Sequence, residues 1–123
     1  MARTALELTA QQLATYRPAR VETDPRVRER IERARETARV AAALLRDRFG
    51  ATRVVLFGSL VHPDSFTPWS DIDIAAWGVP PDQLFRAVGA LSGLSCEFKI
   101  DLIDPEVCRR ALRDEINREG KDL

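Results

Sequence analysis

The sequence Val-Val-Leu-Phe-Gly-Ser at residues 54–59 is a short run of β-branched and aromatic residues that ends abruptly at Gly58 and Ser59. A continuous apolar run of this length, bounded by a glycine, is typical of a buried strand followed by a tight turn. Glycine at that point lets backbone N–H groups approach an anion closely, and the serine hydroxyl adds another donor. The stretch therefore predicts a strand followed by a phosphate-binding turn at Gly58 and Ser59.

A second pattern with chemical content is Ser-Asp-Ile-Asp-Ile-Ala-Ala-Trp at residues 70–77. Polar and apolar residues alternate at its start, which predicts a strand from Asp71 to Trp77. Side chains two residues apart leave the same face of a strand, so we expect Asp71 and Asp73 to converge. Two adjacent carboxylates repel one another unless a cation lies between them, and Mg²⁺ commonly binds one or two carboxylates together with substrate phosphates. The sequence therefore predicts a Mg²⁺ site close to the phosphate turn.

A third acidic residue, Asp101, stands inside the apolar segment from Phe98 to Ile103, which predicts another strand. Burying a charge there is costly without a partner. If this strand lies beside the strand of Asp71 and Asp73 with a matching face, Asp101 becomes a third carboxylate that binds a metal or accepts the proton of an attacking hydroxyl. Each aspartate alone is typical of a solvent-facing residue, but the three together with the Gly-Ser turn form a pattern that chance explains poorly.

A long amphipathic helix is predicted from Pro25 to about Phe49, with Asp24 as its N-cap and Gly50 as its stop. We interpret it as a layer packed behind the sheet, with a dimer or partner interface as the alternative. Its charges favour ion pairs within the helix over a nucleic-acid surface, because both signs are interleaved. The residues concerned are Arg26, Arg28, Arg30, Arg33 and Arg35 with Glu29, Glu32 and Glu36.

Two further helices are predicted, one from Asp82 to Leu91 and one from Pro105 to about Arg118. The residues expected to face inward are Leu84, Phe85, Val88 and Leu91 in the first and Val107, Cys108, Leu112 and Ile116 in the second. Residues 1–24 are interpreted as an N-terminal extension with weak helical periodicity. Residues 25–123 are expected to form the domain that carries the site.

Composition narrows the classes of function. Lysine plus arginine and aspartate plus glutamate each total 19, so the formal net charge is zero and no overall positive field favours nucleic acid or an anionic membrane. No stretch approaches the roughly 20 apolar residues that span a bilayer, and the N-terminus lacks the apolar core of a signal peptide. Cys96 and Cys108 have no metal-ligand spacing and are expected to be reduced thiols. We therefore expect a cytoplasmic protein.

These motifs, from Val54 to Gly120, resemble the minimal nucleotidyltransferases of the DNA polymerase beta superfamily. The Gly-Ser turn, the Asp-x-Asp pair and the later aspartate occur in the expected order. The resemblance implies an α+β nucleotidyltransferase fold, in which a small mixed β-sheet packs against helices. It also implies that Gly58 and Ser59 hold the triphosphate of ATP, that Asp71 and Asp73 bind Mg²⁺, and that Asp101 completes the metal site or activates the acceptor.

Many members of this family are partners of an all-helical HEPN ribonuclease in toxin-antitoxin pairs, and some transfer AMP to a tyrosine of that toxin. The resemblance therefore implies an AMP transferase with a HEPN-type toxin as its partner. The alternative is an antitoxin that neutralises its toxin by binding alone. A transferase acting on a small molecule is disfavoured, since such enzymes generally carry an additional helical domain. The sequence does not fix the oligomeric state.

One departure from the family pattern follows the Gly-Ser turn. Family members often continue with a small residue, an arginine and a glycine, whereas this chain has Leu-Val-His-Pro at residues 60–63. His62 is then either a substitute phosphate donor or an exposed loop residue without a role. Trp69 and Trp77 are expected to pack in the core or at its rim, with stacking on a nucleotide base as the alternative.

Overall fold

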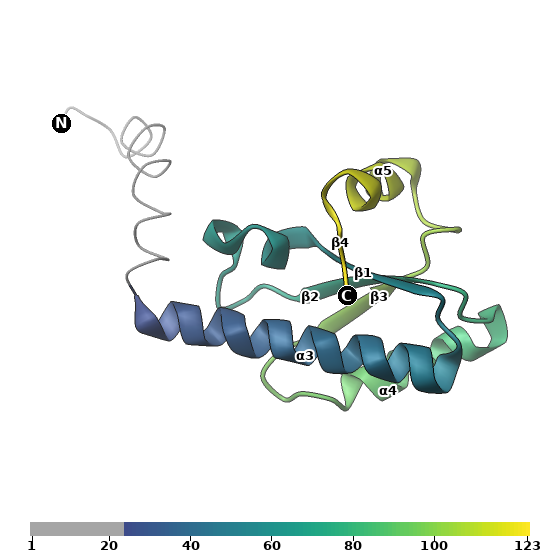
Figure 1. Cartoon of the computed structure of the whole chain (residues 1–123), viewed down its shortest axis with the longest axis horizontal. Helices are drawn as coiled ribbons and strands as arrows, with labels where there is room; N and C mark the ends of the chain where they lie inside the picture. The colour runs from purple at the N-terminus through teal and green to yellow at the C-terminus, as the bar shows by residue number, and fades with distance from the viewer. Residues whose placement is uncertain (1–23) are drawn as a thin grey trace.

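Four strands form one mixed sheet in the order β3-β2-β1-β4 in the computed structural model, which describes residues 24–123 (Figure 1). β1 (Arg53–Phe57) pairs antiparallel with β2 (Ile72–Trp77) and with β4 (Lys121–Asp122), and β2 pairs parallel with β3 (Ile100–Ile103). The expected α+β fold with a small mixed sheet is confirmed, although β4 had no counterpart among the predicted strands. The predicted extension lies outside the described residues, except for Asp24.

Helices cover both faces of this sheet. Helices α3 (Pro25–Phe49) and α4 (Leu84–Ser92) lie on one face, and α5 (Arg110–Glu119) lies on the other (Figure 1). Side chains of β2 alternate between the faces: Ile72, Ile74 and Ala76 belong to the large core under α3, whereas Ala75 and Trp77 pack with Ile116 of α5. Asp73 therefore faces the α5 side.

Helix α3 begins and ends as the sequence predicts. The Asp24 carboxylate accepts a hydrogen bond of 3.0 Å from the Arg26 amide, and Gly50 adopts a left-handed conformation with φ 75°. Fully buried alanines, including Ala34, Ala38 and Ala41, allow the helix to lie close to the sheet. The interpretation of this helix as a layer behind the sheet is confirmed.

The ion pairs of α3 differ in part from the prediction. Arg30 and Arg33 both bind the Glu97 carboxylate, at 3.1 Å and 2.7 Å, so their partner comes from the segment before β3. Arg30 also donates to the Pro68 carbonyl and lies over the Phe98 ring. Arg39 with Glu36 is the pair within the helix that does form. The charges on α3 therefore fasten it to two loops, a role that spacing along one helix does not reveal.

The predicted inward face of α4 is wrong in part. Leu91 is buried as expected, but Phe85 is 88% exposed and Val88 is exposed, while Ala87 is fully buried. The helix begins at Leu84, two residues later than predicted, after a 3-10 turn at Pro81–Gln83. Ala87, and not Phe85, belongs to the core under α3.

Helix α5 begins later than predicted. The Asp104 carboxylate accepts a hydrogen bond from the Glu106 amide, which caps a turn and not a helix. The guanidinium of Arg113 donates to the carbonyls of Pro105, Glu106 and Cys108, so these oxygens find their partner in one side chain. The segment 105–109 therefore stays non-helical, and Val107, expected inside, is 78% exposed.

Two further expectations concern membrane-spanning helices and the two cysteines. None of the helices described in residues 24–123 is long and apolar enough to cross a membrane. Cys96 and Cys108 are both free thiols; Cys96 is exposed and Cys108 is half-buried.

Candidate functional site

The turn after β1 brings glycine into direct contact with an acidic side chain. Phe57, the last residue of β1, pairs with Asp73 in β2, so the chain passes next to that aspartate as it leaves the sheet. Gly58 has φ 79°, and a Cβ built on it would lie 2.2 Å from Oδ2 of Asp73. No residue with a side chain fits here without displacing the carboxylate. The glycine predicted to hold a phosphate therefore lies against one of the predicted metal ligands.

Gly58 and Ser59 open a 3-10 turn that ends at Val61. The side chains of Leu60 and Val61 are buried and anchor this turn to the core, while Gly58 and Ser59 stay half-buried at the surface. The first amides of such a turn have no hydrogen-bond partner within the turn itself. The predicted phosphate turn thus has a fixed backbone, although its role in binding stays a prediction.

The three aspartates predicted to form the site lie together on the α5 side of the sheet. Asp73 in β2 is the register partner of Asp101 in β3, so two carboxylates stand side by side on neighbouring parallel strands. Asp71 lies just before β2, close enough to Asp101 that this second carboxylate, after burial, helps to raise its pKa. The matching face expected for Asp101 is confirmed.

Burial, followed by repulsion from neighbouring carboxylates, makes Asp71 and Asp73 harder to ionise. Burial, followed by the charges of Asp101, Asp71 and Glu115, raises the pKa of Asp73 to about 6. The pKa of Asp71 is raised as well, first by burial and then by Asp101. Lys99 is the nearby cation, and its Nζ lies 3.8 Å from Oδ1 of Asp101. A single exposed lysine leaves most of the negative charge unbalanced.

The donor set fits a hard divalent cation. Three carboxylates and nearby turn amides match the preference of Mg²⁺ for oxygen ligands shared with phosphates. Burial and the neighbouring carboxylates raise the pKa of Asp71 and of Asp73, and a bound cation would offset the repulsion between these groups. Among residues 24–123, no group of three His, Cys, Asp or Glu side chains is already arranged around a metal position. The chemistry of the residues therefore suits Mg²⁺, but their arrangement is not that of a preformed cage.

Two glutamates of α5 belong to the surroundings of the site and were missed by the sequence analysis. Glu115 contributes to the raised pKa of Asp73, and Glu119 accepts a hydrogen bond of 2.9 Å from Nε2 of His62. Their four-residue spacing shows that they share one face of a helix. Nothing in the sequence places that face over Asp73, because the position of α5 depends on packing of Ile116 against β1 and β2.

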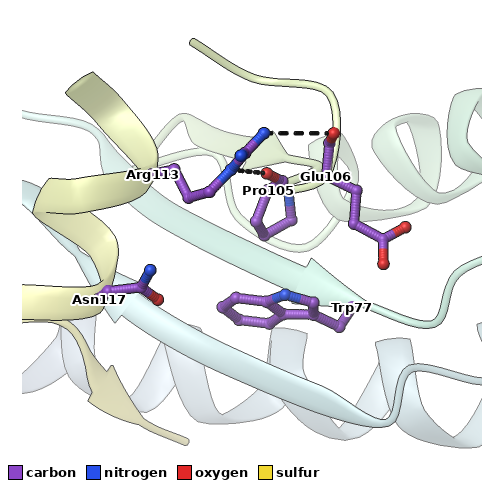
Figure 2. Close-up of a pocket in the computed structure, with 5 residues that line it drawn as sticks. All are labelled: Trp77, Pro105, Glu106, Arg113 and Asn117. Atoms are coloured by element: carbon purple, nitrogen blue, oxygen red, sulfur yellow. Dashed lines mark hydrogen bonds between the residues drawn. The ribbon is translucent and has the colours of Figure 1, made fainter. Parts of the chain in front are cut away.

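A separate pocket of about 320 Å³ lies at the other end of the α5 side of the sheet, beside the end of β2. Figure 2 shows Trp77 on one side of it and Pro105 and Arg113 on the other. The Arg53 guanidinium lies 4.6 Å from the centroid of the Trp77 ring, so this tryptophan packs at the rim of the core as expected. Trp69 is 86% exposed, and for it the expectation of core packing is wrong.

A mixed sheet with grouped carboxylates beside a Gly-Ser turn defines a protein with the minimal nucleotidyltransferase fold. Solved structures agree with this assignment. The structure of a candidate minimal nucleotidyltransferase is 27% identical, with a TM-score of 0.61, over 76% of this chain and 95% of the other. The resemblance inferred from the motifs is thereby confirmed at the level of structure.

Toxin-antitoxin structures are also similar to this chain. One, solved with AMP-PNP, is 25% identical over 66% of this chain and 67% of the other, with a TM-score of 0.56. A second, a mutant of the toxin-antitoxin MntA-HepT, is 26% identical over 69% of each chain, with the same TM-score. No protein-family model matches the chain, and no curated protein matches its sequence. The likeness therefore rests on the fold and on the motifs of the site.

Proposed function

We propose that this protein is a Mg²⁺-dependent nucleotidyltransferase that transfers AMP from ATP to a hydroxyl acceptor, which is a tyrosine of a HEPN-type toxin partner. The observation that carries the proposal is the register of Asp73 with Asp101, next to a glycine at which any side chain would displace the Asp73 carboxylate. The partner is proposed from the likeness to toxin-antitoxin structures. Cytoplasmic location remains part of this proposal.

Each residue of the site has a separate role in the proposed reaction. Asp71 and Asp73 would hold Mg²⁺, which neutralises triphosphate charge and orients the α-phosphate when it is bound. Gly58 and Ser59 would bind the phosphates through backbone amides and the serine hydroxyl. Asp101, half-buried beside them, would complete the metal site or accept the proton of the acceptor hydroxyl as that oxygen attacks the α-phosphorus in line and pyrophosphate leaves.

Transfer of labelled AMP from ATP to a co-purified toxin partner tests the proposal. Asp73→Asn should reduce the transfer by roughly a hundred- to a thousandfold, because it removes a ligand charge at the reacting centre. Asp82→Asn is the matched control, since Asp82 is exposed in the turn before α4. Undiminished transfer by Asp73→Asn would remove the proposed mechanism.

Binding without catalysis is the second candidate function, and one observation favours it. The segment from Gly58 to Ser70 contains no lysine or arginine, so the turn lacks a permanently cationic side chain for the triphosphate. An antitoxin that covers its toxin would need no such group. Calorimetry with ATP and Mg²⁺ separates the two: absence of measurable binding favours the antitoxin that acts by binding alone.

A further inference from the structure

The candidate site lacks positive charge on the side of the phosphate turn. Asp71, Asp73, Asp101 and Glu115 are all acidic, and ATP would add further negative charge. Bound Mg²⁺ offsets part of this at the carboxylates, but phosphates farther along the chain of the nucleotide need donors from the protein. From Gly58 to Ser70, the one side chain able to carry a positive charge is His62.

His62 is held in place at the end of the phosphate turn. Its backbone amide donates to the Ser59 carbonyl at 3.0 Å, which closes the turn. Its ring Nε2 lies 2.9 Å from Oε1 of Glu119, the last residue of α5. The Glu119 carboxylate and the carbonyl end of the helix both present negative charge to the ring. The side chain nevertheless remains 51% exposed, so part of the ring is free for a ligand.

Helix α5 lies beside both His62 and Asp73. Glu115 lies close enough to Asp73 to raise the pKa of that carboxyl group, and Glu119 contacts His62. Glu115 and Glu119 are four residues apart, so they lie about 6 Å from each other on one face of the helix. Glu115 near Asp73 and Glu119 at His62 therefore place the histidine and the aspartate along the same face of α5.

Glu119 itself lies between the side chains of His62 and Arg118. The hydrogen bond from His62, followed by the charges of His62 and Arg118, lowers the pKa of Glu119. Oε1 faces His62, and Oε2 lies 3.6 Å from Nε of Arg118. Because Nε2 of His62 is engaged by Glu119, Nδ1 is the ring nitrogen left to donate when the imidazole is protonated.

We propose that His62 binds the terminal phosphates of the nucleotide and that Glu119 is the positioning residue that orients its ring. This inference rests on the proposed function, since it names the protein group that would receive the phosphates leaving as pyrophosphate. It assigns a role to a contact between the phosphate turn and the end of α5 that the aspartates alone do not explain.

Calorimetry on the full chain with Mg²⁺ tests the inference, using ATP, inorganic tripolyphosphate and AMP as separate ligands. His62→Gln should weaken ATP and tripolyphosphate binding by roughly tenfold, the effect of losing one hydrogen bond to a charged group, and should leave AMP binding unchanged. His62→Arg should retain the affinity for both polyphosphates. Glu119→Gln should weaken polyphosphate binding less than His62→Gln does. Ser65→Ala, exposed in the neighbouring turn, is the control and should bind like the unmodified chain.

The outcomes separate this inference from the proposed function. If the unmodified chain binds ATP and His62→Gln binds it equally well, the role of His62 is refuted and the proposed function stands. If His62→Gln weakens ATP and AMP by the same factor, the residue supports the fold of the turn and does not contact the terminal phosphates. If the unmodified chain binds no ATP with Mg²⁺, both proposals fail. Thermal unfolding of each variant shows that it is folded, and Glu119→Gln provides a second test that leaves His62 in place.

Discussion

At the scale of single residues, Gly58 and Gly50 share a left-handed backbone but have different surroundings. Replacing either by alanine should cost about 1 kcal/mol in backbone strain. At Gly58 the new Cβ would also meet Oδ2 of Asp73 at 2.2 Å, whereas at Gly50 it would meet nothing within 4 Å. We therefore expect Gly58→Ala to lose ATP binding with Mg²⁺ in calorimetry and Gly50→Ala to keep it. Equal affinities in the two variants would show that the Gly58–Asp73 contact does not shape the site.

The raised pKa of Asp73 makes stability depend on pH. The folded state binds the proton more tightly than the unfolded state, since the pKa rises from its ordinary value of 3.8 to about 6. The contribution of Asp73 to stability is therefore most favourable below about pH 4, falls as the pH rises toward 6, and carries the full penalty of the charged carboxylate above that. In thermal unfolding without metal, Asp73→Asn should be more stable than the unmodified chain at pH 7.5, with the difference disappearing near pH 4. Asp82→Asn should show no such crossover.

Metal binding should reverse this penalty. Mg²⁺ that binds the folded state stabilises it by mass action, and the gain depends on the ligands being present. We expect Mg²⁺ to raise the melting temperature of the unmodified chain at pH 7.5 and to leave that of Asp73→Asn unchanged. An equal increase in both would mean that the ion binds elsewhere.

At the scale of elements, Gly120 allows α5 to end against the sheet. A Cβ at this position would lie 2.3 Å from Cγ1 of Val55 and 2.5 Å from the Ile116 carbonyl oxygen. Gly120→Ala should therefore destabilise the fold by roughly 1–3 kcal/mol, as overpacking does. Gly89→Ala in α4 meets nothing within 4 Å and should stabilise by roughly 0.5–1 kcal/mol. Urea unfolding measures both, and a neutral Gly120→Ala would contradict the close approach.

Sequence patterns predicted the elements whose signals are local. Strands β1 and β2 were located by their apolar and alternating residues, and α3 by Asp24, Pro25 and Gly50. The start of α5 was wrong because a side chain eight residues away, Arg113, binds the carbonyl of Pro105. Such a distant contact has no periodic signal, and the same is true of β4, which is too short to show one.

The same difference between local and distant signals applies to the residues of the candidate site. Asp71, Asp73 and Asp101 were predicted from their spacing and from the cost of a charge in an apolar strand, and the sheet brings them together. Glu115 and Glu119 were missed because their approach to Asp73 and His62 depends on how α5 packs. Site residues that lie on the strands were predictable from the sequence, whereas site residues on the packed helix α5 were not.

At the scale of the whole molecule, alanines set the distance between α3 and the sheet. Ala38 is fully buried against it, and Ala43 is exposed on the opposite side of the same helix. Ala38→Leu should force the layers apart and cost roughly 1–3 kcal/mol, while Ala43→Leu should change stability by less than about 0.5 kcal/mol. Chemical denaturation of the two variants checks this, and equal stabilities would show that the layers can separate at little cost.

The site depends on the exact parallel register of β2 and β3. In β1, β2 and β3 the odd-numbered residues face α5 and the even-numbered residues face α3, so Asp73 and Asp101 meet because both numbers are odd. One residue inserted between Ile100 and Asp101 would invert this parity and turn the carboxylate toward the apolar layer. Insertions in the connection between β2 and β3 leave the parity within each strand untouched. Natural variation in length should therefore fall in connections of this kind, while the frame of each strand stays constant.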